Sequence, residues 1–294
     1  MKTKLAGIFA PITTPFVNEE VSLDQFRENI RKYKKTALAG IFVLGSNGES
    51  KSLTESEKIA LLEVVLSERG GHQMVMAGTG YESTRQTIAF SKKVAGMGAD
   101  CVSVVTPSYF KKHMTDDALI AMYSEVAEAL TVPVIIYNAP GFTGVTVSPK
   151  VVKALAAHPN IAGMKDSSTG NMSSYLLAAQ GADFNVLAGT VSTLLPSMML
   201  GATGGVVSLA NAFPASSCEL YDRYLAGDAE GALKLHNTLY VLNQSVSGSF
   251  GVAGVKYAME LGGFHGGDPR KPLLPLKEKD RESIRTAARA AGMI

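Results

Sequence analysis

Short apolar runs rich in valine and isoleucine recur along this chain, and segments with helix-like spacing separate them. The alternation of such runs with helices is expected for parallel βαβ units. Eight runs favour an α/β fold of the closed (β/α)8 barrel type over an open doubly wound sheet. The predicted strands cover residues 7–12, 41–45, 74–78, 101–106, 132–138, 161–167, 184–189 and 204–209.

Helix start signals follow several of these strands. Residues 22–25 and 54–57 both read as capping boxes, in which a hydroxyl and a later acidic or amide side chain satisfy free backbone N–H groups. Thr115 opens a predicted helix that continues through Leu130. Ser148 precedes another helix, with proline at the favoured first helical position.

The last quarter of the chain lacks the alternation of strands and helices and is predicted to be helical. After a predicted helix near residues 214–226, three helical segments follow at 228–246, 252–260 and 278–291, separated by turns rich in glycine and proline. We therefore expect a catalytic barrel over residues 1–226 and a C-terminal helical region over residues 227–294.

Composition narrows the class of partner. The chain has 294 residues, of which 46% are hydrophobic and 18% charged, so it can bury a large core. Its net charge is +2 without a basic run, which excludes an obvious surface for nucleic acid or an anionic membrane. No stretch approaches the roughly 20 apolar residues of a membrane span, and Pro11 and Pro15 interrupt the N-terminal apolar run. We expect a cytoplasmic protein with a small-molecule substrate.

Neither a metal nor a cofactor is predicted. Cys101 and Cys218 belong to no CxxC or Cys/His cluster, and we expect both to be buried apolar residues in a reducing compartment. The histidines lack metal-ligand spacing. Residues 78–83 superficially match a dinucleotide fingerprint, but Ser83 replaces the third glycine, and a loop ahead of an N-cap serine explains the segment better.

Lys165 is the most informative residue, because it places one ammonium group near the end of an otherwise apolar predicted strand. A charge on a buried strand is costly unless it is paired or used. Desolvation can favour a neutral amine, which attacks a ketone to form a Schiff base. The alternative is a structural lysine at a solvated strand end or one paired with a carboxylate such as Glu49.

Other reactive residues follow the predicted strands. In (β/α)8 enzymes the chemistry collects at the carboxyl ends of strands, where this chain has residues 45–49, Tyr109 and Tyr137. The glycine-flanked turn at 45–49 can present N–H groups to a carboxylate, or it is a simple Asx or ST turn. Tyr137 is a proton-transfer group or a packed aromatic. Together with Lys165 these residues supply what an imine-forming pyruvate enzyme needs.

Four motifs in order along the chain resemble the dihydrodipicolinate synthase/N-acetylneuraminate lyase family of class I aldolases. The resemblance covers essentially the whole length and implies a homo-oligomer, a tetramer built as a dimer of dimers. The motifs are Gly45-Ser46-Asn47-Gly48-Glu49, Tyr137-Asn138-Ala139-Pro140 with Thr143-Gly144, Gly163-Met164-Lys165-Asp166-Ser167 and Gly204-Gly205-Val206-Val207-Ser208.

The resemblance also implies roles for individual residues. Lys165 corresponds to the Schiff-base lysine and Tyr137 to the proton-relay tyrosine, while Ser46 and Asn47 match the pair that binds the pyruvoyl carboxylate. Ser46 would also extend the proton relay. Tyr109 matches a tyrosine that in many members reaches the neighbouring subunit's site, and Val207 matches a position whose backbone carbonyl faces the substrate.

Two departures bear on the substrate. Lysine-pathway synthases have Thr-Thr where this chain has Ser46-Asn47. At the substrate-binding position 142 they have an arginine, which binds the distal carboxylate of aspartate semialdehyde, whereas this chain has Phe142. These features look closer to the 4-hydroxy-2-oxoglutarate aldolase branch. We therefore predict a lyase that joins pyruvate to a small aldehyde or releases it. The alternatives are a 4-hydroxy-tetrahydrodipicolinate synthase, a 2-oxo-3-deoxy sugar-acid aldolase or dehydratase and, outside the class, a non-catalytic regulator that binds pyruvate or a sugar acid.

Overall fold

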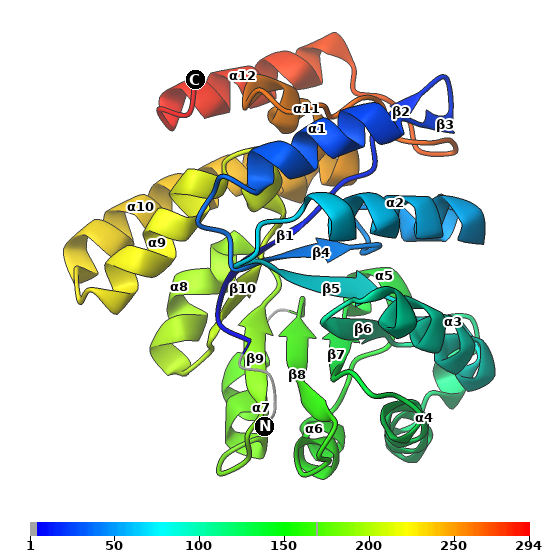
Figure 1. The fold of residues 1–294 in the computed structure, drawn as a ribbon. Coiled ribbons are helices and arrows are strands. Elements are labelled where there is room, and N and C mark those ends of the chain that lie inside the picture. Colours follow the sequence, from blue (N-terminus) through cyan, green and yellow to red (C-terminus); the bar gives the residue numbers. More distant parts are fainter. Residues whose placement is uncertain (1–4, 169) are drawn as a thin grey trace. The chain divides into compact units, whose positions relative to one another are not determined.

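Eight strands of the computed structural model, which describes residues 5–168 and 170–294, form a closed barrel (Figure 1). Their order around the barrel is β1-β10-β9-β8-β7-β6-β5-β4. The predicted (β/α)8 fold is confirmed, and each strand lies within a few residues of its predicted run. The strands are β1 (Gly7–Pro11), β4 (Gly40–Val43), β5 (Met74–Gly78), β6 (Cys101–Val105), β7 (Val134–Asn138), β8 (Ile161–Asp166), β9 (Asn185–Ala188) and β10 (Gly204–Val206).

Internal contacts divide the chain into two compact units. Met76–Gly189 and Pro196–Gly205 make up most of the first unit, and Gly7–Val75, Thr190–Leu195 and Val206–Ile294 make up the second. The boundary near residue 226 that the sequence suggests stays a prediction.

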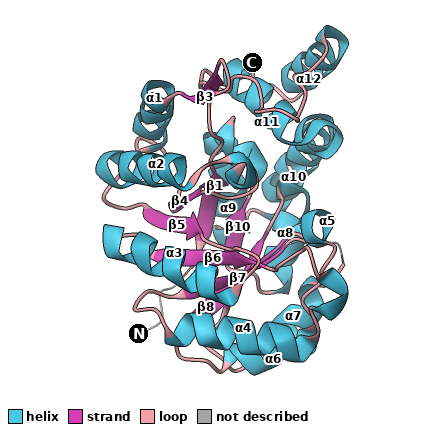
Figure 2. Cartoon of the chain, turned by 90° about the vertical axis from the view of Figure 1, so that its right-hand side faces the viewer, coloured by secondary structure: helices cyan, strands magenta, loops and turns pink. Residues whose placement is uncertain are grey.

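The first unit contains consecutive parallel strands with helices packed outside them. Strands β5 to β9 pair in parallel along the chain order. Figure 2 shows the long helices of this unit lying along the outer face of these strands. The helices are α3 (Thr84–Met97), α4 (Asp116–Glu128), α5 (Pro140–Thr143), α6 (Pro149–Ala156) and α7 (Met172–Ala178), with a 3-10 turn η2 (Lys111–His113).

Local sequence explains where these helices begin. The hydroxyls of Ser83, Thr115 and Ser148 each accept a hydrogen bond from the backbone N–H three residues later. Such N-caps satisfy donors that the first helical turn leaves free. The interpretation of Ser83 as an N-cap is thereby confirmed.

The second unit combines the parallel pair β1–β4 with most of the remaining helices. Within it α1 packs beside α2, α9 beside α10, and α11 beside α12 (Figure 1). Its helices are α1 (Leu23–Tyr33), α2 (Glu55–Glu68), α9 (Pro214–Leu225), α10 (Ala229–Asn243), α11 (Ser249–Leu261) and α12 (Glu278–Ala290), with the short turns η1 (Ser50–Ser52), η3 (Ser208–Asn211) and η4 (Gln244–Gly248). Helix α8 (Val191–Leu200) has residues in both units.

Three details differ from expectation. Ser22 precedes α1 but makes no side-chain cap hydrogen bond, so the first predicted capping box is wrong, whereas the box at Thr54 and Glu57 is confirmed. The predicted helix over 228–246 changes to a π-helical turn at η4. A hairpin of β2 (Phe16–Val17) and β3 (Glu20–Val21) was not predicted.

Both cysteines are free thiols in buried positions, as expected. Burial raises the pKa of the Cys218 thiol to about 12. In the part of the chain that the structure describes, no helix combines the length and the apolar character that crossing a membrane requires.

Candidate active site

Lys165 and Tyr137 lie side by side on neighbouring strands of the first unit. They are direct Cα partners in the parallel pair β7–β8, and the lysine Nζ lies 4.1 Å from the centre of the tyrosine ring. Each residue is only 4% exposed. Because paired positions on adjacent strands project to the same face, the amine and the phenol share one side of the barrel wall. A cation at this distance from a ring face is attracted by its quadrupole.

The next residue on each strand projects to the opposite face, where a buried hydrogen-bond network holds the two strands together. Asn138 Nδ2 donates to Asp166 Oδ1 at 2.8 Å and to Tyr175 Oη at 3.1 Å. The Tyr175 hydroxyl donates to the Val147 carbonyl at 2.7 Å, and the Val147 N–H donates to Asn138 Oδ1 at 3.0 Å. This network fixes the register that brings Tyr137 beside Lys165.

Burial has a clear electrostatic consequence in this network. It raises the pKa of the Asp166 carboxyl, while hydrogen bonds from Ser168 and Asn138 oppose the shift. Burial also raises the pKa of Tyr175 to about 12, so its hydroxyl remains a donor at neutral pH. Sequence analysis did not single out Asp166 or Tyr175, although the predicted Lys165 motif includes Asp166.

Tyr109 and Phe142 occupy exposed positions of the first unit, Tyr109 in a loop and Phe142 in the short helix α5. Their exposed fractions are 80% and 74%, in contrast to buried Lys165. The loop at Tyr109 is ordered by Glu82, whose carboxylate accepts from the Tyr109 N–H at 3.0 Å and the Ser108 hydroxyl at 2.8 Å. The tyrosine ring packs edge-to-face on Phe110 at 5.0 Å. In one chain, therefore, the loop is fixed while the aromatic ring stays accessible.

The Lys111 side chain lies beside Gly144, the residue that follows the short helix of Phe142. A β-carbon placed on Gly144 would lie 3.2 Å from Cδ and 3.6 Å from Nζ of Lys111. The backbone of Gly144 has a φ of +65°, which glycine adopts without steric cost. An ammonium group thus lies close to Gly144, two residues after Phe142, which itself offers no charge.

In the second unit, the predicted carboxylate-binding turn follows β4. The Gly48 N–H donates to the Gly45 carbonyl and the Glu49 N–H to the Ser46 carbonyl, each at 3.1 Å. Ser46 and Asn47 are half-buried, and Asn47 Nδ2 donates to Ser208 Oγ at 2.8 Å. Sequence analysis quoted Ser208 only as part of a motif and gave it no role.

Val207 also belongs to the second unit and is fully buried. Its N–H donates to the Phe9 carbonyl at 3.2 Å, and its own carbonyl accepts from Ala210 at 3.1 Å. A carbonyl oxygen has two lone pairs, so the bond from Ala210 alone does not saturate it.

Glu49, the partner considered for Lys165, makes an ion pair with Lys256, whose Nζ lies 2.7 Å from Glu49 Oε1. Lys256 is a lone lysine in an apolar segment of α11, the same signal that drew attention to Lys165. That signal could have found Lys256 in the sequence, but not its distant partner. The site roles of Lys165, Tyr137, Tyr109, Ser46, Asn47, Val207 and Phe142 stay predictions.

Comparisons with known proteins match almost the whole chain to one protein family. The profile of the Dihydrodipicolinate synthetase family matches residues 4–291. A 4-hydroxy-tetrahydrodipicolinate synthase from Geobacter sulfurreducens is 36% identical over 281 residues, which cover 95% of this chain and 96% of that protein. An uncharacterized DapA-like lyase from Halobacterium salinarum is 35% identical over 291 residues, covering 99% of this chain and 95% of the relative.

Solved structures share the same fold. A dihydrodipicolinate synthase from Thermotoga maritima has a TM-score of 0.94 at 29% identity, covering 98% of this chain and 99% of that chain. The chloride-inhibited dihydrodipicolinate synthase from Acinetobacter baumannii, solved in complex with pyruvate, has a TM-score of 0.93 at 31% identity, covering 99% and 100%. This chain therefore belongs to the dihydrodipicolinate synthetase family and is an enzyme of the class I pyruvate aldolase type.

Proposed function

We propose that Lys165 forms an imine with the C2 ketone of pyruvate and that the enzyme couples this pyruvate to a short acidic aldehyde. The observation that carries the proposal is the buried amine of Lys165 beside the Tyr137 ring on paired strands. The neutral amine adds to C2, and water leaves to give the protonated imine. Loss of a proton from C3 then gives a neutral enamine, which attacks the aldehyde carbon. Cleavage follows the same steps in reverse.

Tyr137 is the proposed proton-transfer group. Its phenol lies on the same face as the amine, and its ring position relative to Lys165 is fixed by strand register. Such a group can carry protons during loss of water and during formation of the C4 hydroxyl. In the family pattern Ser46 and Tyr109 extend this relay, and the N–H groups and side chains of Ser46 and Asn47 receive the pyruvate carboxylate.

The identity of the aldehyde substrate has to be argued separately from the imine step. Relatives from Methanospirillum hungatei and Geobacter sulfurreducens are 4-hydroxy-tetrahydrodipicolinate synthases, which supports that alternative better than the 4-hydroxy-2-oxoglutarate aldolase interpretation. We propose aspartate semialdehyde as the partner. Lys111, whose ammonium lies near Gly144 just after the short helix of Phe142, supplies the cation for the distal carboxylate that an arginine at position 142 would otherwise provide.

One observation favours the second candidate, 4-hydroxy-2-oxoglutarate aldolase. Phe142 has no hydrogen-bonding group, whereas arginine could make a bidentate, charge-assisted contact to the carboxylate of aspartate semialdehyde. Losing a buried contact of that kind costs about 2–5 kcal/mol. The two candidates therefore differ in whether Lys111 compensates for Phe142.

Borohydride trapping tests the imine on Lys165, and turnover measurements test the aldehyde substrate. Borohydride reduction in the presence of pyruvate should attach a pyruvate-derived adduct to Lys165, identified by peptide mass spectrometry. Lys165→Ala should abolish the adduct and turnover, and Lys165→Arg should do the same because a guanidinium stays protonated. An adduct confined to other lysines would overturn the imine assignment. Condensation with aspartate semialdehyde, measured against cleavage of 4-hydroxy-2-oxoglutarate, decides the aldehyde.

A further inference from the structure

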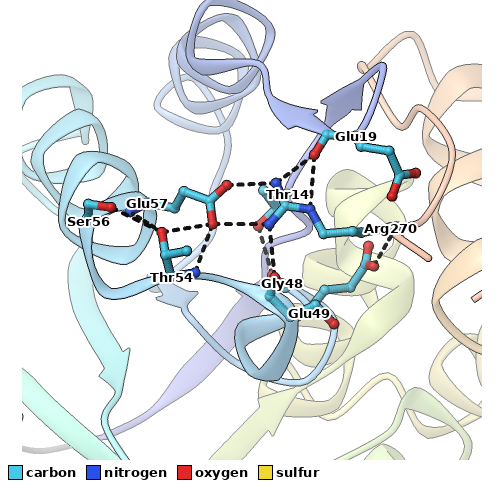
Figure 3. A network of polar contacts seen from close by, with 9 residues as sticks. Thr14, Glu19, Gly48, Glu49, Thr54, Ser56, Glu57 and Arg270 are labelled. Carbon is cyan, nitrogen blue, oxygen red and sulfur yellow. Dashed lines mark hydrogen bonds and ion pairs between the residues drawn. The ribbon is translucent and has the colours of Figure 1, made fainter. Parts of the chain in front are cut away.

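The turn over residues 45–49 ends on a carboxylate that is almost completely buried. The Glu49 side chain is 2% exposed, and its Oε1 lies 2.7 Å from Lys256 Nζ. The other oxygen, Oε2, accepts a hydrogen bond from the Arg270 backbone N–H at 2.9 Å (Figure 3). Both oxygens are therefore held by residues close to the C-terminus, in the same unit as the turn.

Lys256 is buried with no exposed side-chain surface. Its Nζ also donates to the Asp268 carbonyl at 2.9 Å and lies 4.4 Å from the centre of the Phe16 ring. Burial lowers the pKa of this lysine, and the Glu49 carboxylate opposes the shift. Removing one member of such a pair leaves the other charge buried without compensation.

Two left-handed residues bracket the turn and require support from their surroundings. Leu44 has a φ of +61° and Glu49 a φ of +53°, a region that non-glycine residues rarely adopt. Strained conformations of this kind persist only where neighbouring contacts impose them. Between these two residues, the Gly48 carbonyl accepts a hydrogen bond from the Thr14 hydroxyl at 2.8 Å (Figure 3). The ion pair to Lys256 holds the end at Glu49.

We propose that Lys256 is a positioning residue for carboxylate binding: by holding Glu49, it keeps Ser46 and Asn47 in the backbone conformation that receives the carboxylate of the 2-oxo acid. This inference rests on the proposed function, in which these two residues contact that carboxylate. Lys256 acts through Glu49 rather than by touching the substrate. Its contribution should therefore appear in the affinity for carboxylate-bearing ketones.

Arg270 offers a matched comparison in the same cluster. Its guanidinium carbon also lies 4.4 Å from the centre of the Phe16 ring. The side chain, however, donates to Glu57 and to the Ser52 carbonyl, and only the backbone N–H reaches Glu49. Arg270→Met thus removes a cation from the same aromatic ring while leaving both the Lys256 ion pair and the backbone N–H bond of Glu49 in place.

The test compares pyruvate with methyl pyruvate, which has the ketone but no carboxylate. For each ketone, the concentration that half-saturates borohydride trapping at Lys165 is measured in the wild type, Lys256→Met and Arg270→Met. In Lys256→Met the value for pyruvate should rise about 10–100-fold, as expected for a misplaced binding group. The value for methyl pyruvate should change less than about threefold, because this ketone has no carboxylate for the held turn to bind. Both values in Arg270→Met should also change less than about threefold, because this substitution leaves the turn held by Lys256.

A double-mutant cycle shows whether Lys256 works through Glu49. In a Glu49→Gln background, Lys256→Met should add little to the change in pyruvate half-saturation, because both substitutions remove the same contact. If Lys256→Met fails to fold by circular dichroism, Glu49→Gln alone should raise the pyruvate value at least about fivefold without affecting methyl pyruvate.

Specific outcomes would overturn the inference. An unchanged pyruvate value in folded Lys256→Met, an equal rise for both ketones, additive effects in the cycle or an unchanged Glu49→Gln would each contradict it while the proposed function stands. A wild type that traps no pyruvate on Lys165 would overturn the proposed function and this inference together.

Discussion

The ammonium nitrogen of Lys165 lies 4.1 Å from the centre of the Tyr137 ring, and the two residues are register partners in β7 and β8. A ring face favours a nearby cation by about 0.5–2 kcal/mol. A protonated imine on Lys165 would be a cation at the same place, so the ring would stabilise the imine and the free ammonium alike. The ring would therefore not select between these two states, so the proposed catalytic role of Tyr137 has to rest on its hydroxyl.

Tyr137→Phe separates these two contributions. The substitution keeps the ring beside Lys165 and removes the proposed proton-transfer group, so kcat should fall roughly 10²–10⁴-fold while the protein stays folded. Steady-state turnover with pyruvate and the preferred aldehyde measures the fall. Borohydride trapping at high pyruvate should still label Lys165 in this variant. A loss smaller than about fivefold would reassign the proton transfer to Ser46 or Tyr109.

Asn138→Ala tests the network behind the strands. It removes one donor to Asp166 and the acceptor of the Val147 N–H, which leaves that buried N–H without its partner. The free energy of unfolding should fall by about 2–4 kcal/mol, since each unsatisfied buried group costs about 1–3 kcal/mol. Because the register of Tyr137 and Lys165 depends on this network, kcat should also fall, by roughly 10–100-fold.

Asn185→Ala is the matched control for that variant. Asn185 is also buried, but its amide makes one hydrogen bond, to the Ala162 carbonyl at 2.9 Å. Urea unfolding should show a loss of about 1–2 kcal/mol with kcat nearly unchanged. Equal effects of the two substitutions on kcat would mean that the Asn138 network does not set the geometry of Lys165.

The barrel could be predicted because its signals are local. Each apolar run is bounded by loop residues. The helix caps at Thr54 and Ser83 are each specified by a stretch of only four residues. The β2–β3 hairpin lacked such a signal: Asn18 and Glu19 both adopt positive φ at its tip, but glycine, the usual second residue of such a turn, is missing. The pair of Glu49 and Lys256 joins residues far apart in the chain, and no local pattern specifies it.

Glu57 provides a test of pH dependence. Its hydrogen bonds with Arg270 lower the pKa of this carboxyl from 4.5 to about 2. Between these values the unfolded chain binds a proton that the folded chain does not, so stability is lost as pH falls through this window and is fully present above it. The difference in unfolding free energy between the wild type and Glu57→Gln should therefore shrink as pH falls from 4.5 towards 2.

Urea unfolding at a series of pH values measures this difference. Glu63→Gln, a substitution at an exposed position on the same helix α2, serves as the control. Its stability relative to the wild type should stay constant over the window. A wild-type advantage over Glu57→Gln that grows towards acid would contradict the assigned pKa direction.

Tyr109 is expected to act in the site of a neighbouring subunit. Its ring is 80% exposed in the single chain while Glu82 fixes the loop backbone. Tyr109→Phe and Lys165→Ala homo-oligomers should each be impaired, and mixed oligomers should recover activity through sites that combine intact groups from both chains. Native mass spectrometry verifies the exchange of subunits. Absence of recovery after verified exchange would place Tyr109 outside the neighbouring site.

The last prediction concerns the aldehyde and the pair of Lys111 and Phe142. If Lys111 meets the distal carboxylate, Lys111→Met should lower kcat/KM for aspartate semialdehyde by about 10–100-fold, which corresponds to about 1.4–2.7 kcal/mol of lost transition-state binding. Turnover of neutral-tailed 4-hydroxy-2-oxo acids should change less than about threefold. Lys112→Met is the control, because Lys112 is exposed on the same turn η2.

An arginine at position 142 would add a second donor for the same carboxylate, so Phe142→Arg should partly rescue Lys111→Met. Wild-type cleavage of 4-hydroxy-2-oxoglutarate that exceeds condensation with aspartate semialdehyde, together with no effect of Lys111→Met, would instead establish the aldolase alternative.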